Sequence, residues 1–257
     1  MRRPGGSATT PRMPAYLVHG VPDSPAVWEA LRRHLARRDV VTPTLPGFAG
    51  TPIPDGFGAT CDEYAAWLVA DIARLGEPVD LVGHDWGSIL SLRIASLRPD
   101  LVRSLAVGSG PLDLEYRWHD TAVMWQTPGV GEQLMAMMEG ELAVDGLVGG
   151  GLPRTYAAET VARFDDTMKD AILRLYRSAV DVNPRWAPDL DAIRCPALVV
   201  WPVDDPFVDR RFGQRLAERI HAELLEVDGG HWWPVTHPAE VAAALERLWS
   251  GGTRAQK

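Results

Sequence analysis

The chain has 257 residues, of which 46% are hydrophobic, and its formal net charge is −8. This length suits one sizeable hydrophobic core that carries an insertion. The acidic balance and the lack of a basic, aromatic-rich cluster exclude nucleic acid as an expected partner. No apolar run approaches the roughly 20 residues that a membrane-spanning helix needs, so no membrane association is expected.

Cysteine usage and the N-terminal composition bear on the cellular compartment. The two cysteines, Cys61 and Cys195, lie far apart and match no metal-binding spacing. They predict a reduced, cytoplasmic protein. Residues 1–14 are mostly Arg, Gly, Ser, Thr and Pro, which predicts a disordered tail and not a signal peptide. The sequence leaves the oligomeric state open.

The first half of the chain alternates between predicted strands and helices. Short apolar runs predict strands at 15–18, 39–43, 79–82 and 101–107. Ser24 followed by Pro25 is typical of a helix start. Thr60 and Glu63 form a capping-box pattern ahead of a second helix, and a third helix is expected over 89–97. This order predicts a parallel sheet with helices on both faces.

The alternation stops between residues 113 and 190, where helical patterns occur without a clear strand. The best predicted helix there covers 165–180. Strands then return at 197–201 and 222–227, with helices at 210–219 and 238–249 and a loop at 229–234. We therefore expect an α/β core made of 15–112 and 191–257, and a helical cap made of 113–190.

Three acid or base candidates come directly after predicted strands: Asp85, Asp205 and His231. The carboxyl ends of parallel strands form the crevice in which ligands bind. Asp85 is the middle residue of Gly83-His84-Asp85-Trp86-Gly87, between a strand and a helix. Such a sharp turn holds its middle residue in a strained, exposed position at the top of a sheet.

The chain order of nucleophile, acid and histidine is the one found in the α/β-hydrolase superfamily. The sequence resembles this superfamily from Ala15 to Trp249. The matching motifs are 83–87, His19-Gly20-Val21-Pro22 and Gly230-His231. With Asp in place of Ser at the elbow, the chain resembles the epoxide hydrolases and haloalkane dehalogenases. The resemblance implies an α/β-hydrolase fold with a mostly parallel sheet and an inserted helical cap. It implies no metal and no organic cofactor.

An aspartate nucleophile suits displacement at saturated carbon, because attack by a carboxylate on an ester would only give an anhydride. Displacement leaves an alkyl ester on Asp85. His231, oriented by Asp205, would then activate water against that ester. The resemblance implies that the backbone N–H groups of Val21 and Trp86 form the oxyanion hole.

Alternatives exist for two members of this triad. Asp204 competes with Asp205, and His237 competes with His231. Some dehalogenases take the acid from the end of the preceding strand, but Gly108 and Ser109 stand there in this chain.

The leaving group distinguishes the two chemistries. An opening epoxide needs a proton donor such as Tyr, and Leu175-Tyr176-Arg177 resembles the epoxide hydrolase motif that carries one such tyrosine. A second tyrosine is expected where the chain has Thr121; His119, Trp118 and Tyr116 are nearby substitutes.

A halide instead needs N–H donors. Trp86 and Trp125 are candidates, although Val21 replaces the Asn that many dehalogenases carry. Substrate contacts are expected from Tyr176, Trp125, His119 and His19.

We therefore predict hydrolysis of an epoxide to a vicinal diol through an ester on Asp85. Haloalkane dehalogenation with the same nucleophile is the alternative. A hydrolase-like protein that binds a ligand or closes a ring in a biosynthetic pathway is a further alternative. The aromatic-rich cap indicates a small-molecule substrate of apolar or aromatic character.

Overall fold

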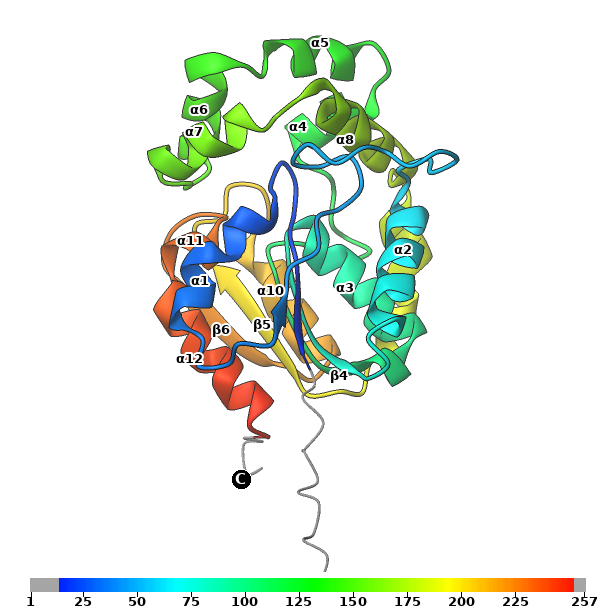
Figure 1. Cartoon of the computed structure of the whole chain (residues 1–257), viewed down its shortest axis with the longest axis vertical. Coiled ribbons are helices and arrows are strands. Elements are labelled where there is room, and N and C mark those ends of the chain that lie inside the picture. Colours follow the sequence, from blue (N-terminus) through cyan, green and yellow to red (C-terminus); the bar gives the residue numbers. More distant parts are fainter. Residues whose placement is uncertain (1–13, 252–257) are drawn as a thin grey trace, which may run out of the picture.

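A computed structural model of the chain describes residues 14–251. The tail predicted at 1–14 therefore lies outside the described residues, apart from Pro14. Within 14–251 the structure has six strands, twelve α-helices and three short 3₁₀ helices, arranged as an α/β core beneath a layer of helices (Figure 1).

The core is one parallel sheet with strand order β2-β1-β3-β4-β5-β6. Its strands are β1 (Ala15–Val18), β2 (Val40–Val41), β3 (Val79–His84), β4 (Val102–Gly108), β5 (Ala197–Pro202) and β6 (Glu223–Val227). The central strands are buried on both faces, as expected for continuous apolar runs in a parallel sheet.

Alternate side chains of each strand enter two hydrophobic cores, one on each face of the sheet. In β1, Tyr16 and Val18 join one core, while Ala15 and Leu17 join the other. The first core packs under α2 (Cys61–Ala73), α3 (Trp86–Leu97) and α10 (Arg210–Arg219). The second packs under α1 (Glu29–His34), α11 (Trp233–Thr236) and α12 (Pro238–Trp249). This arrangement confirms the predicted fold class.

A run of helices separates β4 from β5. It contains α4 (Asp120–Gln126), α5 (Val130–Met137), α6 (Gly140–Gly149), α7 (Arg154–Ala162), α8 (Asp166–Ser178) and α9 (Val182–Trp186). Helices α4 to α8, called the cap helices below, lie above the carboxyl ends of the strands (Figure 1). The division into core and cap at 113 and 190 stays a prediction.

Several local signals in the sequence produce the structures predicted from them. The Thr60 hydroxyl oxygen accepts the backbone N–H of Glu63, and the Glu63 carboxylate accepts the backbone N–H of Thr60. Both contacts of the capping box are therefore confirmed. Ser24 caps a helix through the Ala26 N–H, but this helix begins as the 3₁₀ turn η1 (Pro25–Trp28) before α1.

Two predicted elements differ from the structure. The strand expected at 39–43 is only β2, because it lies at the sheet edge and Pro43 lacks the N–H that would extend it. The loop expected at 229–234 contains the start of α11. The short 3₁₀ helices η2 (Pro99–Leu101) and η3 (Ala187–Ala192) complete the described elements.

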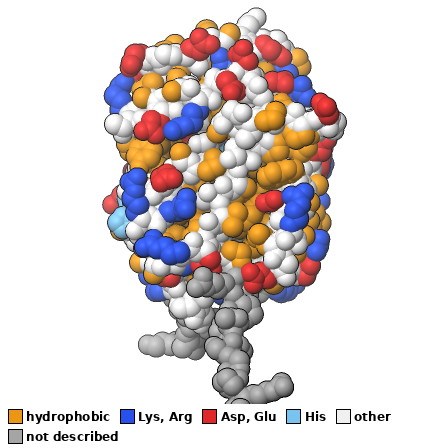
Figure 2. Space-filling model, viewed as in Figure 1, with side chains coloured by type: hydrophobic (Ala, Val, Ile, Leu, Met, Phe, Trp, Pro, Cys, Tyr) orange, Lys and Arg blue, Asp and Glu red, His pale blue; other side chains and the backbone are white. Residues whose placement is uncertain are grey.

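The surface carries an uneven charge. In Figure 2, basic side chains gather over α1, whereas acidic side chains are frequent over the cap helices at the top of the view. Residues 113–190 contain thirteen Asp and Glu against seven Lys and Arg, so this segment supplies most of the net charge of −8.

Candidate active site

Asp85 occupies a strained turn between β3 and α3. Its backbone has φ of 54° and ψ of −121°, a region that costs a non-glycine residue roughly 1–3 kcal/mol. The turn is tight: a Cβ on Gly83 would collide with the backbone of Gly87, and one on Gly87 with that of Val18. The two glycines therefore allow the strand, the turn and α3 to approach closely enough to present Asp85 at the carboxyl end of the inner strand β3.

The two carboxylate oxygens of Asp85 lie in different environments. Oδ1 accepts the backbone N–H of Val21 at 2.7 Å, whereas Oδ2 lies 3.4 Å from Nε2 of His231. The side chain is 16% exposed, and it lines a cavity of about 300 Å³. Gly20 packs against it so closely that an added Cβ would lie 2.5 Å from Oδ1.

His231 and Asp205 form a buried pair beside this carboxylate. Nδ1 of His231 lies 2.9 Å from Oδ2 of Asp205, whose Oδ1 accepts the N–H groups of Phe207 and Val208. Asp204 is exposed, and His237 contacts Thr236. Of the alternatives left open by the sequence, the structure thus brings Asp205 and His231 together with Asp85.

The two partners shift each other's pKa. Burial alone would lower the pKa of His231, but the charge and hydrogen bond of Asp205, together with Asp85, raise it to about 10. Burial alone would raise the pKa of Asp205, but the charge and hydrogen bond of His231 and the Phe207 N–H outweigh it, so this pKa is lowered. Because of these shifts, the free protein favours the charged pair.

Ser109, at the end of β4, is a neighbour whose part in this arrangement the sequence did not reveal. Its Oγ contacts the backbone carbonyl of His231 at 3.3 Å, and a hydrogen bond from it helps to lower the pKa of Asp205. Ser109 follows Gly108 at the end of β4, the strand next to β3. This position was the one feature of the sequence that indicated Ser109.

Tyr176, on α8, is fixed by a group of aromatic rings above Asp85. Its ring centroid lies 5.3 Å from that of Trp86, 5.4 Å from that of Trp118 and 4.9 Å from that of Trp125. Burial, and then the charge of Asp85, raise the pKa of the phenol well above 10. The hydroxyl is therefore protonated in the free protein.

Trp86 follows Asp85 as the first residue of α3. Its backbone N–H lies in the first helical turn, where no earlier turn supplies an acceptor. Together with the Val21 N–H, it is the expected second donor near the Asp85 carboxylate.

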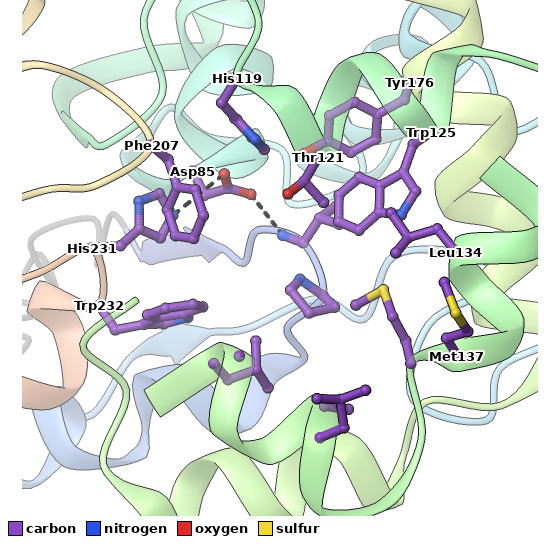
Figure 3. Close-up of a pocket in the computed structure, with 17 residues that line it drawn as sticks. Asp85, His119, Thr121, Trp125, Leu134, Met137, Tyr176, Phe207, His231 and Trp232 are labelled. Carbon is purple, nitrogen blue, oxygen red and sulfur yellow. Dashed lines mark hydrogen bonds and ion pairs between the residues drawn. The ribbon is translucent and has the colours of Figure 1, made fainter. Parts of the chain in front are cut away.

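His119, Thr121 and Trp125 line the same cavity from α4 and its start. In Figure 3, His119, Thr121 and Tyr176 lie on the cap side and face Asp85. His119 is the N-cap of α4, and its Nδ1 accepts the Ala122 N–H at 3.3 Å. Burial lowers its pKa, so the ring is neutral and carries its proton on Nε2.

His19 does not reach the cavity, so the substrate contact expected from it is not supported. The side chain is fully buried, with Nδ1 2.9 Å from the Gly20 carbonyl and Nε2 accepting the Leu45 N–H at 3.2 Å. It therefore anchors the loop that carries Val21. Its motif gave the right location, but the direction of a side chain cannot be read from a motif.

Phe207 and Trp232 are lining residues that the sequence did not reveal. Their rings pack against His231 with centroids 5.1 Å and 5.0 Å away. Their places within two residues of Asp205 and His231 were the available signal. Val21 and Pro22 line the cavity from the loop after β1, and the remaining lining residues come from α5, α6 and Met138 between them, where no motif marked them.

Metal-binding and membrane-spanning features are absent from the described part of the chain. Within residues 14–251, no three His, Cys, Asp or Glu side chains gather as a metal site would require. No helix in this range combines the length and apolar character needed to cross a bilayer.

A family model described as "Alpha/beta hydrolase family" matches residues 15–244, nearly the whole described chain. The chain belongs to the alpha/beta hydrolase family. The fold and the chain order Asp85, Asp205, His231 agree with that membership, and the protein is a hydrolase of this family.

The proteins similar to this alpha/beta hydrolase have names that give different activities. It is 29% identical to 2-hydroxy-6-oxo-2,4-heptadienoate hydrolase of Pseudomonas putida, covering 85% of this chain and 82% of that protein. It is 28% identical to lipase LipV of Mycobacterium tuberculosis, covering 89% and 90%. Among solved structures, haloalkane dehalogenase DbeA of Bradyrhizobium elkani matches with a TM-score of 0.77 and 25% identity, covering 94% and 93%. The structural likeness therefore lies with the dehalogenase-like branch.

Proposed function

We propose that this alpha/beta hydrolase opens an epoxide to a vicinal diol, with Asp85 as nucleophile, His231 as base and Asp205 as the acid that orients it. The observation that carries the proposal is the asymmetry of the Asp85 carboxylate. Oδ1 is held by the Val21 N–H at 2.7 Å, which leaves Oδ2 as the attacking oxygen.

In the first step, Oδ2 attacks an epoxide carbon and the C–O bond of the ring breaks. The ring oxygen becomes an alkoxide, and it takes a proton from the Tyr176 hydroxyl across the cavity. The new bond makes Asp85 an alkyl ester whose carbonyl oxygen is Oδ1. Burial raises the pKa of Tyr176, so the proton is present in the free protein, and it can pass to the alkoxide because an alkoxide is a stronger base than a phenolate.

His119 provides the second donor in place of the tyrosine that the chain lacks at position 121. The Ala122 N–H occupies its Nδ1, so the neutral ring donates only through Nε2. The ring faces Asp85 from above, beside Thr121 (Figure 3). A neutral N–H and a phenol together would then bind the epoxide oxygen as its charge develops.

In the second step, His231 removes a proton from water, and the hydroxide attacks Cγ of the ester. Oδ1 becomes an oxyanion bound by the Val21 and Trp86 N–H groups. The tetrahedral intermediate then breaks the bond to Oδ2, which leaves with the diol and takes the proton from His231. The other proton of the water stays on the new Asp85 carboxyl and passes to the Tyr176 phenolate, so both groups regain their starting protonation. Esterification removes the negative charge of Asp85, one of the causes of the raised pKa of His231. The histidine therefore becomes a better neutral base when water must be activated.

A second candidate is haloalkane dehalogenation. It is favoured by the indole N–H of Trp125, which lines the cavity and has no hydrogen-bond partner within residues 14–251. In Figure 3, however, this nitrogen lies on the side of the indole away from Asp85. A halide leaving from a carbon beside Oδ2 would not meet it. Of the two predicted halide donors this leaves Trp86, whose indole N–H also has no partner within residues 14–251, whereas an epoxide oxygen has two candidate donors, Tyr176 and His119.

The experiment compares both substrates with one enzyme preparation. Diol formation from styrene oxide and halide release from 1-bromobutane are measured for the wild type and for Asp85→Ala. We expect the wild type to form diol faster than it releases bromide, and Asp85→Ala to form none. Faster bromide release would favour the second candidate. Diol formation by Asp85→Ala at the wild-type rate would overturn the proposed nucleophile.

A further inference from the structure

The cavity beside Asp85 continues outward between two cap helices. Its far part is built from aliphatic and sulfur-containing side chains: Leu134, Met137 and Met138 around α5, and Leu142, Ala143 and Leu147 on α6. In Figure 3, Leu134 and Met137 lie well away from the reacting carboxylate. The cavity is therefore longer than the epoxide ring alone requires.

Its outer end is open to solvent and apolar. Met137 is 59% exposed and Leu142 is 71% exposed, yet both also line the cavity. Leu142 and Gly146 are four residues apart on α6, so they lie on the same side of that helix. Large apolar side chains kept in water at the entrance to a cavity are typical of a surface that a ligand covers.

Gly146 determines how wide this outer end is. A Cβ there would meet no atom within 4 Å, and its φ lies outside the left-handed region. A side chain at this position would therefore project into open space and obstruct the entrance without displacing the protein. The absence of a side chain at 146 keeps a channel open along α6.

The electrostatics of the cavity exclude one kind of tail. No Lys or Arg is among the residues that line it. The surrounding segment 113–190 is strongly acidic, as the cap surface in Figure 2 also indicates. A carboxylate on the tail would therefore find no counter-ion among the residues that line the cavity.

We infer that the natural substrate is an epoxide with an uncharged apolar tail, which runs from Asp85 to the entrance between α5 and α6 past Gly146. This rests on the proposed function. Each methylene buried in the channel should raise kcat/KM by about fourfold until the tail reaches solvent. Capping the tail with a carboxylate should cancel that gain.

Two leucine variants test the channel. Gly146→Leu places a side chain in the entrance. Gly149→Leu is the matched control, because Gly149 is also on α6, has no atom near its Cβ position and does not line the cavity. Leucine favours a helix more than glycine does, so both variants should fold.

The assay measures kcat/KM for 1,2-epoxides from epoxybutane to epoxydecane, and for 10,11-epoxyundecanoate. We expect the wild type and Gly149→Leu to gain with chain length and to discriminate against the carboxylate. In Gly146→Leu the gain should stop several methylenes earlier. A flat chain-length profile with active enzyme, equal effects of the two variants, or equal use of the carboxylate would overturn the inference.

A binding measurement separates this inference from the proposed reaction. The change in tryptophan emission when 1,2-decanediol binds requires no turnover, and Trp125 and Trp232 line the cavity. Weaker binding by Gly146→Leu alone would support the channel even if no epoxide were opened. Diol binding that is the same in all three proteins would overturn the channel, even if epoxides were opened.

Discussion

Replacing Gly20 by alanine tests the placement of the nucleophile while every reacting side chain keeps its chemical identity. The new Cβ would lie 2.5 Å from Oδ1 of Asp85, whereas ordinary contact begins at 3.4 Å. Either Asp85 or the loop that carries Val21 must therefore move by about 1 Å. The φ of Gly20 is not left-handed, so alanine adds this collision and no backbone strain.

The size of the effect follows from the same distances. A shift of about 1 Å stretches the 2.7 Å contact between the Val21 N–H and Oδ1 beyond hydrogen-bond reach. It also displaces Oδ2 from the line of attack, and a displacement of this size costs roughly 10²-fold in rate. We expect kcat for the epoxide to fall by about this factor in Gly20→Ala.

The assay is single-turnover formation of the ester together with steady-state kcat, and Gly149→Ala serves as the control because its Cβ would meet no atom within 4 Å. Thermal melting checks that both variants are folded. If Gly20→Ala is folded and turns over at the rate of Gly149→Ala, the contact between Val21 and Asp85 does not position the nucleophile, and the reasoning is refuted.

Three further predictions concern groups around Asp85. Tyr176→Phe keeps the ring contacts but removes the donor, so stopped-flow epoxide opening should slow by roughly 10²–10³-fold; an unchanged rate would assign Tyr176 to packing. His119→Ser keeps an N-cap acceptor on α4 but removes the Nε2 donor, so kcat should fall while the melting temperature stays near that of the wild type; a fall in stability alone would contradict the donor role. In Asp85→Asn, the loss of a negative charge should lower the pKa of His231 from about 10, measured by NMR titration of the imidazole; an unchanged or raised pKa would contradict the coupling.

The elements that follow local rules could be predicted from the sequence. The strands come from short apolar runs, and the helix start at Thr60 comes from a capping box whose two contacts are both present. The elbow at Asp85 has a glycine on each side, Gly83 and Gly87, because the backbone packs too closely there to leave room for a Cβ. The strands and the capping box depend on neighbours within a few residues, so one sequence contains their cause. Gly87 is in addition required by the backbone of Val18 on β1, and only the spacing of its motif indicated this.

Features that depend on contacts between distant segments could not be predicted in the same way. Most helices between β4 and β5 are short, and the apolar periodicity in 113–164 is too weak to give their bounds. The sequence indicated a missing tyrosine at Thr121, but the bond that fixes the proton of His119 depends on where α4 begins. His19 shares a motif with Val21, yet it points into the core because Leu45 supplies its partner from another loop.

The central claim is that Asp85 becomes an ester whose carbonyl carbon is attacked by water. A single turnover of an epoxide in oxygen-18 water, followed by mass spectrometry of the peptide that contains Asp85, tests this directly. The account predicts that this carboxylate gains one labelled oxygen and that the first diol released carries none from water. Label in the diol with none in the Asp85 peptide would contradict it, because water would then attack the epoxide itself.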